Sequence, residues 1–542
     1  MPERAIRYVD EASDSDASMF TDRKDVVIVF PNTSVGSRLV TVTEEQSQRS
    51  AYPGHYTLAL SSKNRYIAEY VEHRFFIHPK LALAQHSVGL ENTQYSPLPK
   101  SINPTQRQAE LTALNKGYKF LGFQFQNEKP QRAEPEEADL GESGTLLLLS
   151  TFKDHAALAK RYQQDARPKT KASAAVAKKA RELSAGLTTD YDKAKAIYNW
   201  INQNIRYVAI YLDNGGLVPN TAESIFRNRY GDCKDHVVLL ESMLRAVGIE
   251  SEPVLVNSGT HYHLPPVALV YPFNHVISFI PVLNLYADPT AQFSPFGILP
   301  FEVSDKPVVH AQSGRTARTP VYTAESNLGR TRVQLRLDSE GVIHGNVSVE
   351  VKGNAEMLSR TLAFERQDSD PGRVSQRLLA TNREIGTGQI FNSDPRDMSI
   401  PFKLGSEFQL ESHVDLPGPG AFTIPVGLTP AMLASRVIRK PPENRTKPFT
   451  CEPELIEEYI SFDLGSKLSI SRLPQDVSFS AGRLKYQSSY RLTDSEGRKK
   501  LDVTRILEVR PESHVCAVET QAHVQELFSV MRRDLRQLIF YE

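Results

Sequence analysis

The first part of the chain consists of short hydrophobic runs separated by polar turns. Residues Val26–Phe30 form a β-branched and aromatic run, which is typical of a strand buried on both faces. Similar runs occur at residues 75–77 and 120–125, and Leu146–Leu149 has the length of a buried strand. This pattern predicts a β-sandwich over residues 1–165.

After about residue 165 the hydrophobic spacing changes from strand-like to helix-like. Ala172–Ala185 is rich in the helix formers alanine and lysine, and a second helix is predicted from Asp190 to Asn204, after an N-cap at Thr189. Apolar residues recur in this second helix at intervals of three and four, so they form one stripe that can dock on a core. Trp200, the only tryptophan, lies on this side and is expected to pack rather than to act in catalysis.

A second pair of helices is predicted further along. Residues 221–226 form a short helix, Arg229–Asp232 ends it, and a longer helix with an apolar stripe continues to Gly248. Cys233 therefore lies in the first turn of the longer helix. Strands are then predicted at residues 253–257, 275–280 and 285–288. We expect these helices and strands to form an α+β domain over residues 166–315.

The remaining chain returns to alternating apolar and polar positions. Val333, Leu335 and Leu337 alternate with polar residues, Asp338–Gly341 predicts a turn, and residues 347–351 alternate again, so a hairpin with one buried face is predicted. The same tetrapeptide, Asp-Ser-Glu-Gly, recurs at residues 494–497 and predicts another turn in a second sandwich-like domain. Helices are predicted at residues 354–365, 371–382 and 521–539. We therefore expect a β-rich C-terminal domain over residues 316–542, within a chain of the α+β class.

Composition limits the function classes. At 542 residues the chain is too long for one core and should form about three domains. Lysine plus arginine and aspartate plus glutamate both total 64, so nothing indicates a nucleic-acid-binding surface. The acidic, proline-containing residues 134–139 predict an exposed loop, with attraction to a basic partner as the alternative. The three cysteines lack metal-ligand spacing, so neither a disulfide framework nor a zinc site is indicated, although a single Cys451–Cys516 bridge stays open.

The sequence also bears on location. No window approaches the roughly 18–20 consecutive apolar residues of a membrane helix, so no transmembrane segment is predicted. The first residues, Met1–Arg4, lack the apolar core of a secretory signal. Either the protein stays inside the cell or the segment that would export it is absent from this sequence.

Cys233 is the first candidate catalytic residue. At a helix start, unpaired backbone N–H groups and the positive end of the helix dipole favour a thiolate over a thiol. His275 begins one predicted strand and Asp288 ends the next, so the three side chains converge if the helix packs on that hairpin. A thiol, an imidazole that exchanges its proton and a carboxylate that orients the imidazole form a triad for nucleophilic acyl chemistry. The predicted catalytic residues are therefore Cys233, His275 and Asp288.

Each of these residues has a structural alternative. A buried cysteine is usually an inert hydrophobe, a strand histidine can be satisfied in a core, and an aspartate before proline can shape a turn. His236, one helical turn after Cys233, competes with His275 as the base, and we favour His275 because it has an acid behind it. Asp232 and Asp235 are expected to organise the helix start, and Lys234 is expected to be solvated.

His261 and His263 have an H-x-H spacing that could ligate a metal ion. No cysteine or carboxylate lies nearby, so a loop role is expected for this pair. No metal ion and no other cofactor is predicted.

Three motifs carry a family resemblance. Gly231–Asp235, Phe273–Ser278 and Asp288–Thr290 resemble, in this order, the papain-like Cys-His-Asp core of the transglutaminase-like superfamily. Val29–Pro31 and Gly36–Ser37 resemble the β-rich N-terminal domain of unknown function that precedes this core in bacterial members. The resemblance extends over roughly residues 20–300, and it weakens beyond.

The resemblance implies a cysteine acyltransferase, or an amide or peptide hydrolase, that forms a thioester with a peptide or protein substrate. Animal crosslinking members carry tryptophan directly after the nucleophile, where this chain has Lys234, so protein crosslinking is not expected. For the oxyanion we expect the Cys233 backbone N–H together with Tyr207 or Gln203, with Asp232 in support. Because some lineages have lost the nucleophile, a catalytically silent scaffold or binding protein is the alternative.

The resemblance also bears on compartment and assembly. Members of this layout are often exported in Gram-negative bacteria, which implies a periplasmic or secreted location, with the cytoplasm as the alternative. The oligomeric state, the substrate and the acceptor are not predicted.

Overall fold

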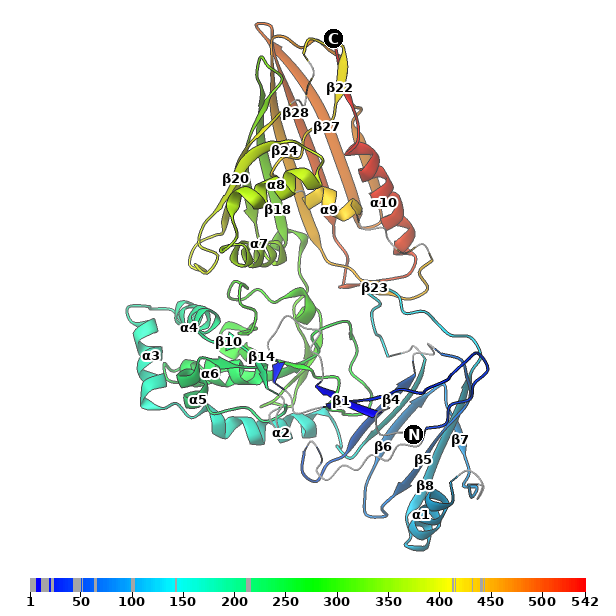
Figure 1. Ribbon diagram of the computed structural model, residues 1–542. Coiled ribbons are helices and arrows are strands. Elements are labelled where there is room, and N and C mark those ends of the chain that lie inside the picture. Colours follow the sequence, from blue (N-terminus) through cyan, green and yellow to red (C-terminus); the bar gives the residue numbers. More distant parts are fainter. Residues whose placement is uncertain are drawn as a thin grey trace. The chain divides into compact units, whose positions relative to one another are not determined.

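The computed structural model forms two compact units of the α+β class (Figure 1). The first comprises Met1–Ala133, Asp139–Thr290 and Lys306–Arg318, and the second comprises Glu134–Ala138, Ala291–Asp305 and Thr319–Glu542. Within the residues that the structure describes, no helix is long and apolar enough to cross a membrane. These residues are 6–10, 19–20, 24–41, 50, 52–62, 66–98, 103–141, 144–210, 216–411, 414, 416–430, 432–438, 442 and 444–542, so Met1–Arg4 lie outside them.

Two three-stranded antiparallel sheets form the predicted N-terminal sandwich. One has the order β4-β9-β6 and the other the order β5-β8-β7. Leu147 and Leu149 of β9 pack against Phe123 of β8, so the two sheets share a hydrophobic core and the predicted buried strand at Leu146–Leu149 is confirmed. The elements are β4 (Thr57–Ser62), β5 (Ala68–Ile77), β6 (Ala84–Val88), β7 (Glu91–Thr93), α1 (Pro104–Asn115), β8 (Lys119–Asn127) and β9 (Thr145–Ser150).

The prediction of a strand buried on both faces at Val26–Phe30 is wrong. This segment contains β3 (Lys24–Ile28), which pairs with β1 (Ile6–Asp10) in a two-stranded ribbon. Val26 is 53% exposed and Val27 is 42% exposed. A run of β-branched residues favours an extended backbone. Whether the strand is buried depends on the other segments that pack on it, and the run itself does not specify them.

The core of the first unit consists of helices packed on a five-stranded antiparallel sheet of order β15-β14-β13-β16-β17. Helix α6 packs on β14, and every residue from Lys234 to Leu244 is buried. The predicted helices and the N-cap at Thr189, whose side chain accepts from the Asp192 N–H, are confirmed. The elements are α2 (His155–Ala166), η2 (Arg167–Thr170), α3 (Ala174–Ser184), α4 (Asp190–Asn204), α5 (Ala222–Asn228), α6 (Cys233–Arg245), β13 (Glu252–Val256), β14 (His275–Ile280), η3 (Pro281–Leu283), β15 (Leu285–Ala287), β16 (Pro307–His310) and β17 (Thr316–Arg318).

Short strands complete this unit. They are β2 (Met19–Phe20), which runs parallel to β11 (Ala209–Ile210), and β10 (Arg206–Tyr207), which runs parallel to β12 (Tyr230–Gly231). Trp200 of α4 stacks on Phe226 with ring centroids 5.6 Å apart, and the Arg229 guanidinium lies 4.8 Å from its ring centroid. These contacts confirm the packing role expected for Trp200.

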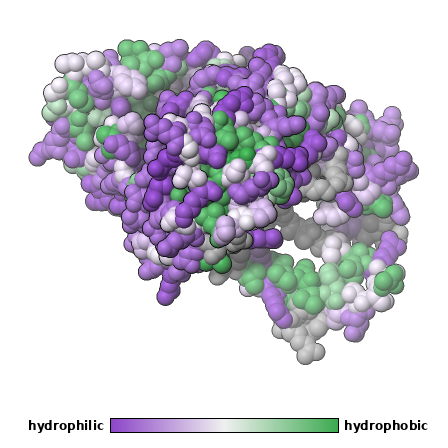
Figure 2. Space-filling view, turned by 90° about the horizontal axis from the view of Figure 1, so that it is seen from above, coloured by the Kyte–Doolittle hydropathy of each residue, from purple (hydrophilic) through white to green (hydrophobic). Residues whose placement is uncertain are grey.

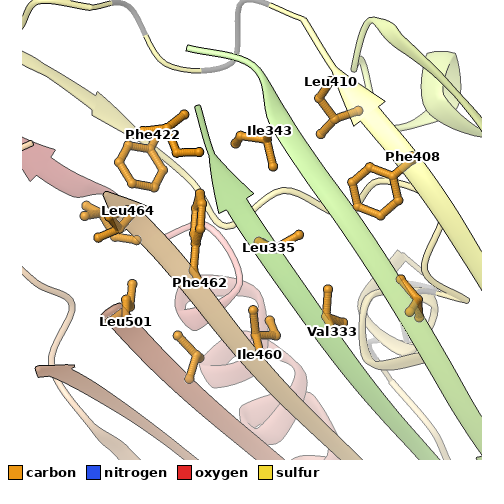
Figure 3. Close-up of a cluster of buried hydrophobic side chains, with 14 of the residues drawn as sticks. Val333, Leu335, Ile343, Phe408, Leu410, Phe422, Ile460, Phe462, Leu464 and Leu501 are labelled. Carbon is orange, nitrogen blue, oxygen red and sulfur yellow. The ribbon is translucent and has the colours of Figure 1, made fainter. Parts of the chain in front are cut away.

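The second unit is built on an eight-stranded sheet of order β20-β21-β19-β18-β24-β28-β27-β26. Only β18 and β24 run parallel among these neighbours, and β18 with β19 is the predicted hairpin. Apolar side chains of six strands of this sheet form one cluster, part of which is drawn in Figure 3. Leu379 of α8 packs in the same cluster. The strands are β18 (Leu328–Leu337), β19 (Ile343–Val351), β20 (Gly386–Asn392), β21 (Lys403–Leu410), β24 (Glu454–Gly465), β26 (Val477–Ala481), β27 (Leu484–Ser495) and β28 (Arg498–Val509).

This arrangement differs from the sandwich-like domain expected at this end of the chain. Alternation correctly indicated one buried face, but helices, together with the short sheet β22-β30-β25, cover the large sheet. The predicted helices at 354–365 and 371–382 are confirmed. The helix predicted at 521–539 is present but ends at Asp534, and Ile539 begins a strand. The covering elements are η4 (Phe301–Val303), η5 (Ala324–Ser326), α7 (Asn354–Glu365), α8 (Pro371–Thr381), β22 (Gly420–Phe422), α9 (Met432–Ile438), β25 (Ile470–Arg472), α10 (Thr520–Asp534) and β30 (Ile539–Tyr541).

The open Cys451–Cys516 pairing is a disulfide in the structure. It closes a 65-residue separation beside the short pair β23 (Phe449–Thr450) and β29 (Val515–Cys516). The molecular surface seen in Figure 2 is mainly hydrophilic, with hydrophobic residues gathered in small patches.

The acidic stretch at residues 134–139 is a loop, as expected, but only Pro135 and Glu136 are exposed in it. Glu134 accepts hydrogen bonds from the backbone N–H and hydroxyl of Thr446, at 2.8 and 2.7 Å, and lies 3.7 Å from Arg445. Ala138 is 5% exposed and its N–H donates to the Pro448 carbonyl. The other residues of this loop are therefore partly covered by residues 445–448 of the same chain.

Candidate active site

The start of α6 presents Cys233 at the first helical position. Asp232 is the N-cap, and it exchanges hydrogen bonds with Asp235 in a capping box. Asp235 is itself fixed by Asn220, whose backbone N–H and side-chain amide donate to its two carboxylate oxygens at 2.7 and 3.0 Å. These contacts give hydrogen-bond partners to backbone N–H groups at the start of α6 and hold the Cys233 backbone in place, as expected for Asp232 and Asp235.

Gly231 is required by the close approach of this cap. A Cβ atom at Gly231 would lie 2.5 Å from the Asp235 Cβ, a distance that would force the backbone or the capping side chain to move. The glycine therefore lets the chain pass directly over the capping box before it enters the helix.

The expectation of a solvated Lys234 is wrong. Lys234 is 4% exposed, and its ammonium group pairs with the Asp232 carboxylate. Burial raises the pKa of Asp232, and the Lys234 charge opposes this effect only in part. The lysine beside the nucleophile is thus part of the packed helix start and one wall of the cavity at Cys233.

His275 and Asp288 form a hydrogen-bonded pair. His275 Nε2 lies 2.9 Å from Asp288 Oδ2, so Nδ1 is the ring nitrogen left for the thiol. The other carboxylate oxygen accepts from the backbone N–H and the hydroxyl of Thr290, at 3.0 and 2.6 Å. The Tyr198 hydroxyl of α4 donates to the Asp288 backbone carbonyl at 2.9 Å. The carboxylate is therefore oriented on both sides before any substrate binds.

The electrostatics of the pair follow from burial and charge together. Burial lowers the pKa of His275, but the Asp288 carboxylate and a hydrogen bond with Cys233 outweigh it, so the pKa lies well above 6.5. Burial raises the pKa of Asp288, but His275 and the Thr290 hydrogen bonds outweigh it, so the pKa lies below 3.8. The protonated imidazole of His275 is thus favoured beside the Asp288 carboxylate.

Cys233 and His275 line one small cavity of about 60 Å³. Cys233 is the free cysteine and is partly exposed. The cavity is also lined by Tyr52, Leu158, Tyr162, Gly216, Leu217, Lys234, Leu255, Val270, Phe273, Asn274 and Val276. Since one water needs roughly 10–15 Å³ by this measure, the cavity admits a few small groups, such as one carboxamide.

Tyr162 of α2 is a candidate that sequence reasoning missed. It is 3% exposed, and among the residues that the structure describes its hydroxyl has no hydrogen-bond partner. Burial, followed by the negative charge of Cys233, raises the pKa of Tyr162 well above 10.0, so the hydroxyl keeps its proton. The only sequence signal was its place on a helix stripe, which is equally typical of core packing.

The other sequence candidates lie elsewhere. His236 is 1% exposed, and its two ring nitrogens contact the backbone oxygens of Asp232 and Ile205 at 2.8 and 3.2 Å, which supports the choice of His275. Tyr207 packs beside the His236 ring, and Gln203 is exposed on α4. Neither Tyr207 nor Gln203 is among the residues that line the cavity with Cys233.

A helix-start thiol, an imidazole on the adjoining strand and a carboxylate after the next strand are the elements of a papain-like nucleophilic site. The family model of the transglutaminase-like superfamily matches residues 177–264, which include Cys233 and end before His275. The model of a domain of unknown function, DUF3857, matches residues 1–130. Residues 177–264 thus match the transglutaminase-like superfamily and residues 1–130 match DUF3857, in the order that the motifs predicted.

A solved structure resembles the fold at low sequence identity. The chain is similar to the crystal structure of a candidate protease from Parabacteroides distasonis, with a TM-score of 0.59, 15% identity, and coverage of 100% of this chain and 86% of that one. A candidate cysteine protease from Cytophaga hutchinsonii gives a TM-score of 0.19 at 14% identity, covering 44% of this chain and 75% of that one. Among curated proteins, none matches this chain.

Proposed function

We propose that this protein is a cysteine acyltransferase, or an amide or peptide hydrolase, that acts through Cys233, His275 and Asp288. The observation that carries the proposal is the buried His275–Asp288 pair, whose remaining ring nitrogen is available to the Cys233 thiol at the rim of a shared cavity. The similarity in fold to the candidate protease from Parabacteroides distasonis supports the hydrolase branch. A peptide or protein amide is the proposed substrate.

The reaction begins when the Cys233 thiolate attacks the carbonyl carbon of an amide. A carbon–sulfur bond forms, and the carbonyl electron pair moves to oxygen to give an oxyanion. The oxyanion then collapses, the carbon–nitrogen bond breaks, and His275 gives its proton to the departing amine. The product of this half-reaction is a thioester on Cys233.

The second half-reaction releases the acyl group. His275, now neutral, takes a proton from water or from a second amine as that nucleophile attacks the thioester carbon and the carbonyl electron pair moves to oxygen. This oxyanion then collapses, the carbon–sulfur bond breaks, and Cys233 leaves as the thiolate beside the protonated His275. Water yields a carboxylic acid, so the protein acts as a hydrolase, whereas an amine yields a new amide, so it acts as a transferase. Asp288 holds the imidazole in one orientation and stabilises its charged form throughout.

For the oxyanion we propose the Cys233 backbone N–H and the Tyr162 hydroxyl. The first lies in the opening turn of α6, where N–H groups lack intrahelical acceptors, and the second is a buried protonated donor that lines the cavity. Tyr207 and Gln203, which the sequence suggested, do not line this cavity. Tyr162→Phe should lower kcat by about 10²-fold while changing KM little, because the lost donor acts on the transition state.

The disulfide supports a location outside the reducing cytoplasm. Such bonds persist mainly in oxidising compartments, and Cys451 and Cys516 form one in the second unit. We therefore propose that the protein works in the periplasm or after secretion.

The test is a peptide library incubated with the protein and a tagged primary amine, with products identified by mass spectrometry. Cleaved or amine-tagged peptides are expected with the wild-type protein and should disappear with Cys233→Ala and with His275→Gln. His344→Gln is the matched control, because His344 also pairs with an aspartate, Asp338 at 3.0 Å, but lies in the second unit. Equal product from Cys233→Ala would reject the proposal, and no product from any form would favour a silent scaffold.

A further inference from the structure

The loop between β13 and β14 carries His261 and His263, and folding brings a carboxylate to this pair. His261 Nδ1 lies 3.3 Å from Asp139 Oδ2, and His263 Nδ1 lies 3.8 Å from Asp139 Oδ1. Asp139 and His263 are 124 residues apart in the sequence. The loop role expected for the H-x-H motif rested on the lack of a nearby carboxylate, and that premise is wrong in the folded chain.

The backbone fixes the carboxylate relative to the two rings. The Asp139 N–H donates to the Thr260 carbonyl at 2.8 Å, and the Tyr262 N–H donates to the Asp139 carbonyl at 3.0 Å, so the two segments run side by side. The Gly141 N–H donates to Asp139 Oδ1 at 2.8 Å. This contact orients the carboxylate so that Oδ2 faces His261, as outer hydrogen bonds orient the ligands of a metal ion.

The histidine loop is held in place by its own contacts. The Lys306 ammonium binds the backbone carbonyls of Gly259 and His261 and lies 3.2 Å from the centre of the Tyr262 ring. The Ser258 N–H donates to Asn274 Oδ1 at 2.7 Å, and Asn274 Nδ2 donates back to the Ser258 carbonyl at 2.9 Å. Two histidines on such a restrained loop lose little conformational freedom when they bind a ligand.

The three side chains offer ligand atoms that all lie within 4.8 Å of one another. In the described part of the chain no other three histidine, cysteine or acidic residues meet this condition. In a tetrahedral site with bonds of about 2.0–2.1 Å, ligand atoms lie about 3.3–3.4 Å apart, which matches Asp139 and His261. His263 Nδ1 lies 3.1 Å from the Asp139 backbone carbonyl, so the His263 ring has to turn from this contact to complete the site when an ion binds.

We propose that Asp139, His261 and His263 form a site for a divalent transition-metal ion of the zinc class. Two imidazoles and one carboxylate suit such ions, whereas Mg²⁺ and Ca²⁺ prefer oxygen ligands alone. The side chains of Asp139, His261 and His263 are 15%, 28% and 22% exposed, so an ion can enter from solvent and keep water at the open position. The ion ties Asp139 to the loop that ends at His275.

The test measures Zn²⁺ binding to chelator-treated protein by calorimetry, with bound metal counted by mass spectrometry. All forms carry Cys233→Ala, so that the thiol of the proposed active site cannot contribute a ligand. One equivalent is expected, with affinity at least 100-fold weaker in Asp139→Asn, His261→Gln and His263→Gln, since loss of an outer contact alone costs about 10–100-fold. His344→Gln, the isolated histidine–aspartate pair in the second unit, should bind as tightly as its parent.

A second readout identifies the ligands. Co²⁺ in place of Zn²⁺ should give the visible bands of a nitrogen and oxygen site of low coordination number, without a thiolate charge-transfer band, and excess Mg²⁺ or Ca²⁺ should not displace it. Folding of each variant is checked by the Trp200 fluorescence transition in urea, and Asp139→Asn keeps the acceptor for Gly141. The proposal is overturned if the parent binds no Zn²⁺, if His261→Gln combined with His263→Gln leaves affinity unchanged, or if Ca²⁺ competes equally. Because no activity is measured, this outcome is independent of the proposed enzymatic function.

Discussion

Asp288→Asn tests the electrostatic pairing at the centre of the site without adding bulk. Asp288 is 3% exposed and faces His275 Nε2 at 2.9 Å. In the variant, Thr290 can still donate to the amide oxygen, so the amide NH₂ group turns toward Nε2. Nε2 must then accept a hydrogen bond, and the single proton of the neutral ring moves to Nδ1, on the side of Cys233.

The pKa directions set the pH range in which the lost pair matters. Folding raises the pKa of His275, so its contribution to stability is complete below 6.5 and is lost as pH rises through the folded-state pKa. Folding lowers the pKa of Asp288, so its contribution is present above 3.8 and is lost as pH falls through the folded-state pKa. Both contributions are complete between pH 3.8 and 6.5.

The expected magnitude follows from burial. The side chains of His275 and Asp288 are 11% and 4% exposed, and breaking a buried pair by removing one partner costs about 3–5 kcal/mol. We predict that Asp288→Asn lowers the free energy of unfolding of the first unit by this amount within that pH range. Above the folded-state pKa of His275 the ring is neutral, and the loss should fall to about 1 kcal/mol, the value of one altered hydrogen bond.

Trp200 makes the measurement specific. It is the only tryptophan, and its ring contacts Phe226 and Arg229 within the first unit, so its fluorescence in urea reports the unfolding of that unit. Asp338→Asn, which removes the partner of His344 in the second unit, is the control and should leave the Trp200 transition unchanged. A stability loss that is constant across pH, or that grows toward alkaline pH, would refute the reasoning.

Other substitutions give simpler outcomes. Asp288→Asn should also lower kcat/KM by about 10⁴-fold, because the neutral His275 ring then carries its proton on the wrong nitrogen. The alkaline limb of the pH profile should move to lower pH, because the charge that raises the pKa of His275 is gone. An unmoved limb would contradict this. A thiol-specific dye should count one cysteine before reduction and three after it, and three reactive thiols without reductant would argue against the disulfide. Replacing Cys451 and Cys516 by Ala should lower the free energy of unfolding of the second unit in guanidinium by about 4 kcal/mol, as a 65-residue loop predicts. Gly231→Ala should cost about 1–3 kcal/mol in the Trp200 transition, because its Cβ would meet Asp235 at 2.5 Å; an unchanged transition would contradict this.

Much of the fold could be predicted because the signals are local. The cap at Thr189, the apolar stripe of α4 and the break before Cys233 all lie within a few residues of the structure that they specify. The triad candidates could be found for a related reason, since each lies in its own short motif at the edge of a predicted helix or strand. The structure then brings His275 and Asp288 within hydrogen-bonding distance.

The features that the sequence did not reveal depend on distant partners. Lys234 looked solvated because its burial results from packing of the whole of α6 and from its pairing with Asp232. The hydrophobic composition of Val26–Phe30 could not show that its strand lies in an exposed two-stranded ribbon. Asp139 and His263 meet only after a loop and a domain linker fold together, and no local pattern joins residues so far apart.

The most direct test of the central claim is to trap the acyl-enzyme. Protein quenched in acid during turnover of a peptide substrate is digested, and the peptide that contains Cys233 is weighed by mass spectrometry. We expect an acyl adduct on Cys233 that hydroxylamine removes, as it removes thioesters, and that is absent in Cys233→Ala and forms far more slowly in His275→Gln. Turnover without any adduct, together with full activity of Cys233→Ala, would contradict the account.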